Sequence, residues 1–236
     1  IYEIAFNRLV KGQCTMKYRS AFDIIGPVMI GPSSSHTAGA ARIGRVARTL
    51  FEKQPTKAVI SLYGSFAKTY KGHGTDLALV AGIMDFDTFD ERIPDALKIA
   101  EQSGLEVEFI TEDAVMEHPN TVKINLYDGQ GKELEIVGIS IGGGTIEITE
   151  INSFKLKLSG GNPAILVVHH DRFGLISAVT TVLSKHQINI GHMEVSRKDK
   201  GDTAVMVIEM DHKIENGVYA ELTALDGVDQ VIRLVD

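Results

Sequence analysis

Three shortages in the sequence each exclude a class of protein. Cys14 is the only cysteine, so the chain forms no internal disulfide and cannot by itself hold an iron–sulfur cluster that needs several thiolates. No apolar run approaches the roughly 18 residues that a membrane span requires. Basic residues number 24 against 31 acidic ones, and this net charge of −7 argues against a general nucleic-acid surface.

The start of the chain also lacks a targeting signal. Residues 1–15 show no basic segment followed by an apolar run, and Met16 resembles a natural start, so we treat residues 1–15 as an extension outside the fold. The single cysteine fits a reducing compartment, and we expect a cytoplasmic protein without a membrane partner. We expect a first domain over residues 16–158 and a second over 159–236, joined by a Ser-Gly-Gly-Asn-Pro linker.

A hydroxyl-rich turn leads directly into a predicted helix. Gly31-Pro32 ends the preceding element, and the residues that follow it are Ser33, Ser34, Ser35, His36 and Thr37. Apolar residues then recur at helical spacing, ending near Lys53. A helix N-terminus offers unpaired N–H groups that attract carboxylates or phosphates, and a histidine there adds a group that titrates near neutrality. Simple helix capping by the serines explains the same pattern, and both interpretations stay open.

A second polar turn carries a histidine in a matching position. His73 lies between Gly72 and Gly74, and Thr75 and Asp76 can cap the apolar helix that follows. A lone histidine is more often structural than catalytic. Two histidines that each precede a helix N-terminus favour a shared function.

The remaining pattern predicts a mixed α and β architecture. In the first domain we expect strands at 58–63, 105–110 and 121–127, a break at Gly64-Ser65, a helix at 93–103 and one strand-like stretch at 138–150 that contains three glycines. After Pro163 the order is strand, helix, strand, strand, helix, strand, which is typical of a ferredoxin-like α+β sandwich.

These motifs together resemble a known enzyme family. The segment Gly31-Pro32-Ser33-Ser34-Ser35-His36-Thr37 is similar to the signature of iron–sulfur L-serine dehydratases. Further blocks of that family have counterparts in the same order, at residues 63–65, 71–76 and 118–120. The segment after Pro163 resembles an ACT domain, and the combination resembles the β chain of the two-subunit form of the enzyme. The resemblance covers residues 16–236.

The resemblance implies a fold, a reaction and a partner. The first domain would have the allosteric-substrate-binding type of α/β fold that some phosphoglycerate dehydrogenases share, so fold alone does not name the reaction. The reaction would be the deamination of L-serine to pyruvate and ammonia by a lyase. A separate α chain would ligate a [4Fe–4S] cluster whose open iron acts on the substrate hydroxyl, so this chain alone would be inactive.

The resemblance also suggests roles for individual residues. His73 would be the general base, with His36 beside it as a second catalytic residue. The substrate would be bound by polar residues of the serine turn and of a third loop at 118–120, namely Ser33, Ser34, Ser35, Thr37, His118 and Asn120. Position 74 is glycine where some relatives carry a second histidine, which puts a mechanism based on adjacent histidines in doubt. L-Threonine stays open as a minor substrate because one methyl group is discriminated by only about 1–3 kcal/mol.

The ACT-like segment suggests regulation or assembly. Asp171, Gly174 and Asn189 are the candidates for an effector site, and we expect self-association through this domain. Its alternative role is only to dimerise or to pack on the first domain. For the whole chain, the main alternative is a non-catalytic amino-acid sensor that regulates a partner enzyme. A Ser-His-Asp hydrolase is disfavoured because the sequence has no G-x-S-x-G elbow.

Overall fold

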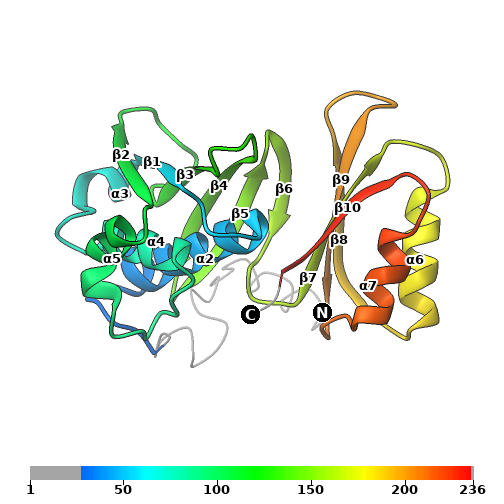
Figure 1. Cartoon of the computed structure of the whole chain (residues 1–236), viewed down its shortest axis with the longest axis horizontal. Helices are drawn as coiled ribbons and strands as arrows, with labels where there is room; N and C mark the ends of the chain where they lie inside the picture. Colours follow the sequence, from blue (N-terminus) through cyan, green and yellow to red (C-terminus); the bar gives the residue numbers. More distant parts are fainter. Residues whose placement is uncertain (1–27, 235–236) are drawn as a thin grey trace, which may run out of the picture.

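The chain builds two β-sheets, one after the other along the sequence (Figure 1). The computed structural model describes residues 28–234. The first sheet has six strands in the order β2-β1-β3-β4-β5-β6. Its strands are β1 (Lys57–Tyr63), β2 (Glu106–Glu112), β3 (Thr121–Tyr127), β4 (Glu133–Gly142), β5 (Thr145–Ile151) and β6 (Phe154–Leu158). Strands β1 and β2 run parallel and the other neighbours are antiparallel, because only β1 and β2 are joined by a helical crossover.

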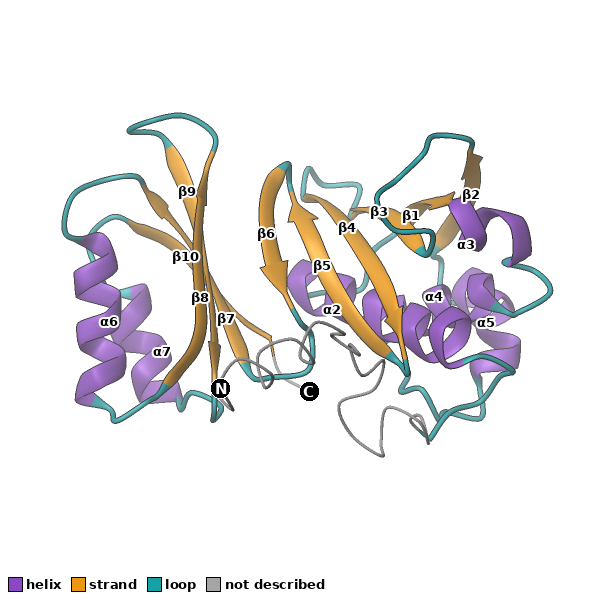
Figure 2. Cartoon of the chain, turned by 180° about the vertical axis from the view of Figure 1, so that it is seen from behind, coloured by secondary structure: helices purple, strands orange, loops and turns teal. Residues whose placement is uncertain are grey.

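Helices cover one face of this sheet, and the opposite face is seen in Figure 2. They are a π-helical turn η2 (Ser34–Ala38), α2 (Gly39–Phe51), α3 (Gly64–Thr69), α4 (Thr75–Ile83), a 3-10 turn η3 (Ile93–Asp95) and α5 (Ala96–Gln102). Alternate residues of β1, such as Ile60 and Leu62, are fully buried beneath the helices, as are Ile43 and Phe51 of α2. Period-2 burial in the strands and a one-sided apolar face on α2 therefore form one core.

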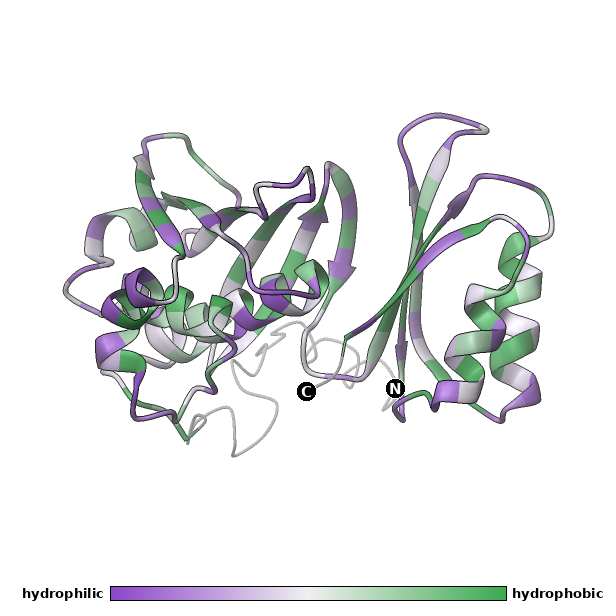
Figure 3. Cartoon of the chain, viewed as in Figure 1, coloured by the Kyte–Doolittle hydropathy of each residue, from purple (hydrophilic) through white to green (hydrophobic). Residues whose placement is uncertain are grey.

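The second sheet has the predicted ferredoxin-like arrangement. Its elements are β7 (Ala164–His170), α6 (Leu175–Lys185), β8 (Ile190–Arg197), β9 (Thr203–Met210), α7 (Asn216–Thr223) and β10 (Val228–Leu234). The strand order is β10-β7-β9-β8, and every neighbouring pair is antiparallel. Helices α6 and α7 cover one face, where Val179 and Leu183 of α6 and Leu222 of α7 belong to a buried apolar cluster with the strands. Hydrophobic residues recur along these strands and both helices (Figure 3).

The second sheet turns its other face towards the first domain (Figures 1 and 2). Leu166, Val205 and Ile232 lie on that face and are less than one tenth exposed. They belong to the same apolar cluster as Leu134 and Phe154 of the first domain. The two sheets therefore share a continuous apolar contact, which joins the domains through side chains as well as through the linker.

The first domain differs from the sequence-based expectation in three places. Strand β1 ends before Gly64-Ser65 as expected, but this pair also begins the short helix α3, which was not predicted; Phe66 is fully buried there and the Thr69 hydroxyl donates to the Ser65 carbonyl. The stretch 138–150 is a hairpin of β4 and β5, with positive φ at all three glycines of the turn. Strand β6 was not predicted, although its residues alternate between buried and exposed positions.

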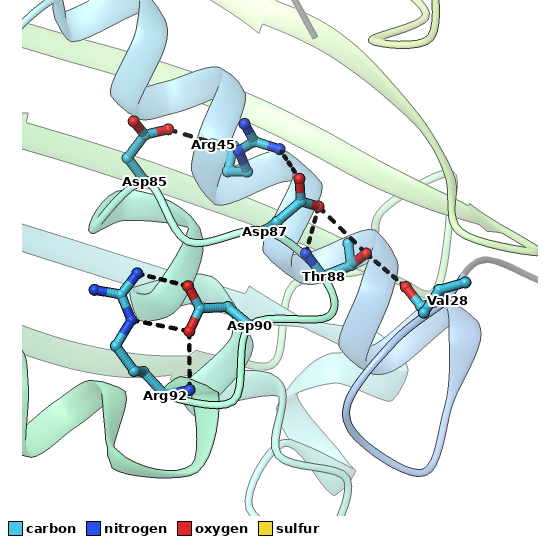
Figure 4. A network of polar contacts seen from close by, with 7 residues as sticks. All are labelled: Val28, Arg45, Asp85, Asp87, Thr88, Asp90 and Arg92. Atoms are coloured by element: carbon cyan, nitrogen blue, oxygen red, sulfur yellow. Dashed lines mark hydrogen bonds and ion pairs between the residues drawn. The ribbon is translucent and has the colours of Figure 1, made fainter.

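A polar network fastens the loop after α4 to helix α2 (Figure 4). Arg45 of α2 lies 3.1 Å from Asp87 and 3.6 Å from Asp85, and the Thr88 hydroxyl donates to the Val28 carbonyl. The network fixes the end of α4 against α2, the helix that begins at the serine turn.

Within residues 28–234, no helix is long and apolar enough to cross a membrane.

Candidate functional site

The two histidine turns meet at one end of helices α2 and α4. The rings of His36 and His73 lie 4.8 Å apart between centroids, with their planes at 85° to each other. His36 belongs to η2, which runs into α2, and His73 lies just before the first turn of α4. The Thr37 hydroxyl donates to the His73 carbonyl over 3.1 Å and links the turns directly. Turns separated by more than thirty residues in sequence thus form one polar cluster.

The serine turn is a π-helical turn with a capped start. The Ser33 hydroxyl accepts a hydrogen bond from the His36 N–H at 3.1 Å, so Ser33 performs the capping role that the sequence left open. Within residues 28–234, the N–H groups of Ser34 and Ser35 have no acceptor. Such N–H groups at the start of a helix are suited to a carboxylate. π-Helical turns are frequent at functional sites because they widen the backbone locally.

Hydroxyl groups hold both nitrogens of the His36 ring. Nδ1 lies 3.1 Å from Ser35 Oγ, and Nε2 lies 3.0 Å from Ser65 Oγ. The Phe66 ring packs edge-on against the imidazole at 5.2 Å. Burial, followed by the nearby His73, lowers the pKa of His36 below its usual 6.5. His36 is therefore a fixed, predominantly neutral imidazole near pH 7.

His73 has a different environment. Its ring makes no hydrogen bond with any described residue. Of its two ring nitrogens, Nδ1 is buried without a partner, whereas Nε2 is not buried. The Nε2 atom is therefore open to solvent or to a ligand. Two hydrogen bonds fix the His73 backbone: its N–H donates to the Thr69 carbonyl, and its carbonyl accepts from the Thr37 hydroxyl. Of the two imidazoles, His73 is the one available for proton transfer.

The third predicted loop adjoins the other two. The Pro119 carbonyl accepts from the Ser65 N–H at 2.7 Å, which places residues 118–120 beside the hydroxyl that contacts His36. This contact requires Gly64, whose φ is +54° and where an added Cβ would lie 2.6 Å from the Pro119 oxygen. His118 Nδ1 accepts from the Asn120 N–H, so the neutral ring carries its proton on Nε2. The Asn120 side-chain amide donates to the Ser140 carbonyl at 3.2 Å.

Two residues at this site were not assigned from the sequence. Ser65 lay inside a family-like block, but its hydroxyl role became visible only from the fold. Ser140 lies on β4, against Gly39 of α2, and no local motif marked it. Within the described chain, Ser140 Oγ, Thr75 Oγ1 and His73 Nδ1 are buried and have no partner. Orphaned buried polar atoms are rare, and three of them around one cluster are consistent with a small polar ligand.

The structure separates the candidate effector residues. Asp171 and Gly174 precede α6, whereas Asn189 follows it, so a helix of 11 residues, about 16 Å long, lies between them. Asp171 accepts from the Gly201 N–H and from Arg197, and these two bonds, in that order, lower its pKa. Asn189 donates to Asp211 over 2.8 Å. Within one chain, these residues do not converge on one ligand.

The described residues do not suit a metal centre. Between residues 28 and 234, no group of three His, Cys, Asp or Glu side chains is arranged to hold a metal ion. The only cysteine, Cys14, lies outside that range, and a [4Fe–4S] cluster is usually held by several thiolates. The single cysteine and the described residues therefore do not supply the set of thiolates that the cluster implied by the resemblance would need.

Comparisons with known proteins agree across both domains. Residues 20–150 match the serine dehydratase beta chain family, and residues 164–227 match the ACT domain family. A Bacillus subtilis protein named "Probable L-serine dehydratase, beta chain" is 62% identical over 94% of this chain and all of its own length. The "L-serine dehydratase, beta chain" of Peptoniphilus asaccharolyticus is 36% identical over 88% of this chain and 94% of its own length.

A third relative has a different name. The D-3-phosphoglycerate dehydrogenase of Synechocystis is 22% identical over 89% of this chain, which corresponds to 38% of that enzyme. The likeness extends over most of the chain and yet reaches a protein named for another reaction. The architecture therefore does not determine the reaction by itself, and the residues of the histidine turns do.

Proposed function

Because this chain belongs to the serine dehydratase beta-chain family, we propose that it is the β subunit of an L-serine ammonia-lyase. The observation that carries the proposal is the meeting of the His36 and His73 turns, with ring centroids 4.8 Å apart, beside the serine-rich helix start. One α-amino acid is small enough to touch both turns. The reaction converts L-serine to pyruvate and ammonia.

The serine turn is the proposed carboxylate site. The N–H groups of Ser34 and Ser35 have no acceptor within the described chain, and the Ser34 hydroxyl is likewise free of hydrogen bonds there. A carboxylate at this point gains charge-assisted hydrogen bonds and the favourable end of the helix dipole. The substrate amino group and hydroxyl then lie towards Thr37, His118 and Asn120.

His73 is the proposed base. Both nitrogens of the His36 ring face hydroxyl partners, whereas the His73 ring has none among the described residues, and its Nδ1 is buried. The Nε2 atom of His73 is therefore the nitrogen that can accept the proton from Cα of serine. The Cβ hydroxyl group leaves together with one proton as water, and aminoacrylate remains. This product tautomerises to the imine, which adds water and releases ammonia and pyruvate. His36 stays neutral and orients the Ser35 and Ser65 hydroxyls towards the substrate.

A partner chain completes the site in this proposal. The single cysteine supports an α chain as the owner of the [4Fe–4S] ligands, and we assign this chain only carboxylate binding and proton abstraction. We further propose that the ACT domain self-associates, with β8 as the edge strand nearest to solvent. The cytoplasm stays the expected compartment because of the cysteine usage.

Reconstitution tests the proposal against the sensor alternative. The chain and its cysteine-bearing partner are purified separately under anaerobic conditions, and pyruvate formation from L-serine is measured for each chain and for the mixture. We expect turnover only in the mixture. Equal turnover by the partner alone would make this chain a regulatory subunit and would refute the proposal.

A further inference from the structure

A cavity of about 240 Å³ lies between the two domains, away from the histidine turns. The first domain contributes side chains from α2 and from strands β4 to β6, and the second contributes its uncovered sheet face. The apolar lining consists of Leu50, Leu134, Ile151, Phe154, Leu166, Val168, Val205 and Ile232. Side chains around it are otherwise closely packed, since Leu50, Leu166 and Val205 are at most 4% exposed. A void of this size is unusual in an interface packed like a protein interior.

The size of the cavity limits its occupant. An apolar cavity of about 150 Å³ accommodates benzene, so one of 240 Å³ accommodates a molecule of about nine or ten non-hydrogen atoms. All of the apolar lining residues except Phe154 are aliphatic, which favours a branched or straight alkyl group in this part of the cavity over a sugar or a nucleotide.

The rim adds charges of both signs. Lys132 and Glu133 line the cavity together with the Gln230 amide and the Thr203 hydroxyl. The Lys132 ammonium donates to Glu52 over 2.9 Å, and Gln230 donates to the same carboxylate over 3.0 Å. Among the described residues Glu133 and the Thr203 hydroxyl have no partner. An ammonium has three donors, so Lys132 can bind a second carboxylate while it keeps Glu52.

The balance of these charges selects the ligand class. Glu52 is already paired with Lys132 and Gln230, whereas Glu133 has no partner among the described residues and Lys132 keeps unused N–H donors. A fatty acid would leave the Glu133 carboxylate unpaired and be repelled by it, and an amine without a carboxylate would leave the remaining donors of Lys132 unused. A zwitterion satisfies both signs, with its ammonium on Glu133 and its carboxylate on Lys132. We propose that the interdomain cavity is a binding site for an aliphatic α-amino acid of leucine size.

The location gives such a site a route to the rest of the molecule. Leu50, in the last turn of α2, lines the cavity, and Glu52 caps the end of the same helix. The first turn of that helix follows directly from the serine turn. The cavity and the histidine cluster therefore lie at opposite ends of one helix. The proposal itself concerns binding, and it does not depend on the serine reaction.

Ligand-dependent thermal unfolding of the full chain tests the proposal without a partner chain. L-Leucine at about 10 mM is expected to raise Tm in a concentration-dependent way, because a ligand that binds only the folded state stabilises it. L-Serine has no alkyl group that could fill the cavity, so binding of L-serine at this site is expected to change Tm only slightly. 4-Methylpentanoate and 3-methylbutylamine, which each lack one charge, are expected to bind about tenfold more weakly or worse.

Two variants tie the effect to the cavity. Val168→Phe fills part of the cavity, and Val115→Phe makes the same change at a fully exposed loop position as its matched control. Lys132→Met removes the rim ammonium and its ion pair with Glu52 at a half-exposed position, so the Tm of this variant without ligand is measured first as its own reference. We expect the leucine effect to disappear in Val168→Phe, to weaken about tenfold in Lys132→Met and to persist in Val115→Phe. No leucine effect in the natural chain, or an undiminished one in Val168→Phe and Lys132→Met, would overturn the proposal.

Discussion

Gly44 of α2 lies directly against Gly82 of α4. A Cβ on Gly44 would lie 2.3 Å from the Leu79 carbonyl oxygen, and a Cβ on Gly82 would lie 2.0 Å from the Ala41 carbonyl oxygen. The two helix backbones therefore touch without side chains between them. Since His36 precedes α2 and His73 precedes α4 by similar lengths of chain, this contact brings the two turns to the same end of the helix pair.

Gly82→Ala is expected to destabilise the fold by pushing α2 away from α4. Overpacking of a close backbone contact costs about 1–3 kcal/mol, which corresponds to a fall in Tm of about 2–12 °C for a chain of this size. Gly217→Ala in α7 is the matched control, because an added Cβ there has no heavy atom within 4 Å. The control is expected to leave Tm unchanged or slightly raised. A Gly82→Ala variant as stable as this control would show that the contact is not tight.

The two serines at the start of η2 are expected to separate capping from substrate binding. Ser33→Ala removes the cap on the His36 N–H and is expected to lower the free energy of unfolding by about 1 kcal/mol. Ser34 has no such bond, so Ser34→Ala should spare stability and raise KM for L-serine in the reconstituted enzyme. Urea unfolding and steady-state kinetics on both variants check this. An unchanged KM in Ser34→Ala would leave the turn with a capping role alone.

Ser65→Ala is expected to release the Nε2 side of His36. The variant loses the 3.0 Å contact but keeps the backbone bond to Pro119, so α3 should still form. A lost side-chain hydrogen bond costs about 0.5–1.5 kcal/mol. If the activation free energy rises by the same amount, kcat falls by about 2- to 12-fold. Ser65→Thr, which restores a hydroxyl, should recover part of kcat. Lost stability with an unchanged kcat would limit Ser65 to a structural role.

The sequence predicted the meeting of these turns only indirectly. The family prediction is confirmed by the matches over both domains, and the order of elements after Pro163 is confirmed strand by strand. The role of Ser65 could not be predicted, because Gly64-Ser65 correctly indicates the end of a strand but gives no sign of the short helix that begins there with Phe66 buried. The Gly44–Gly82 contact was equally invisible, since isolated glycines in a helical pattern do not indicate their partners.

Acid should weaken the turn between β3 and β4 through Asp128. Its carboxylate accepts from Lys53 and from the N–H groups of Gln130 and Lys132, which lowers its pKa to about 2 from 3.8. A depressed folded-state pKa stabilises the fold above about pH 4, and this contribution is lost as the pH falls towards 2. Asp128→Asn is therefore expected to show a smaller loss of stability between pH 4 and pH 2, measured by urea unfolding. Identical pH profiles for the two proteins would contradict the assignment.

The turnover number of His73→Ala with L-serine, measured in the complex with the cluster-bearing partner, tests the central claim most directly. His212→Ala, in the exposed turn after β9, is the matched histidine control and should turn over normally. If the Nε2 atom of His73 takes the Cα proton, kcat should fall by about 10²- to 10⁴-fold while the complex still assembles. A His73→Ala enzyme with the kcat of the natural protein would contradict the account.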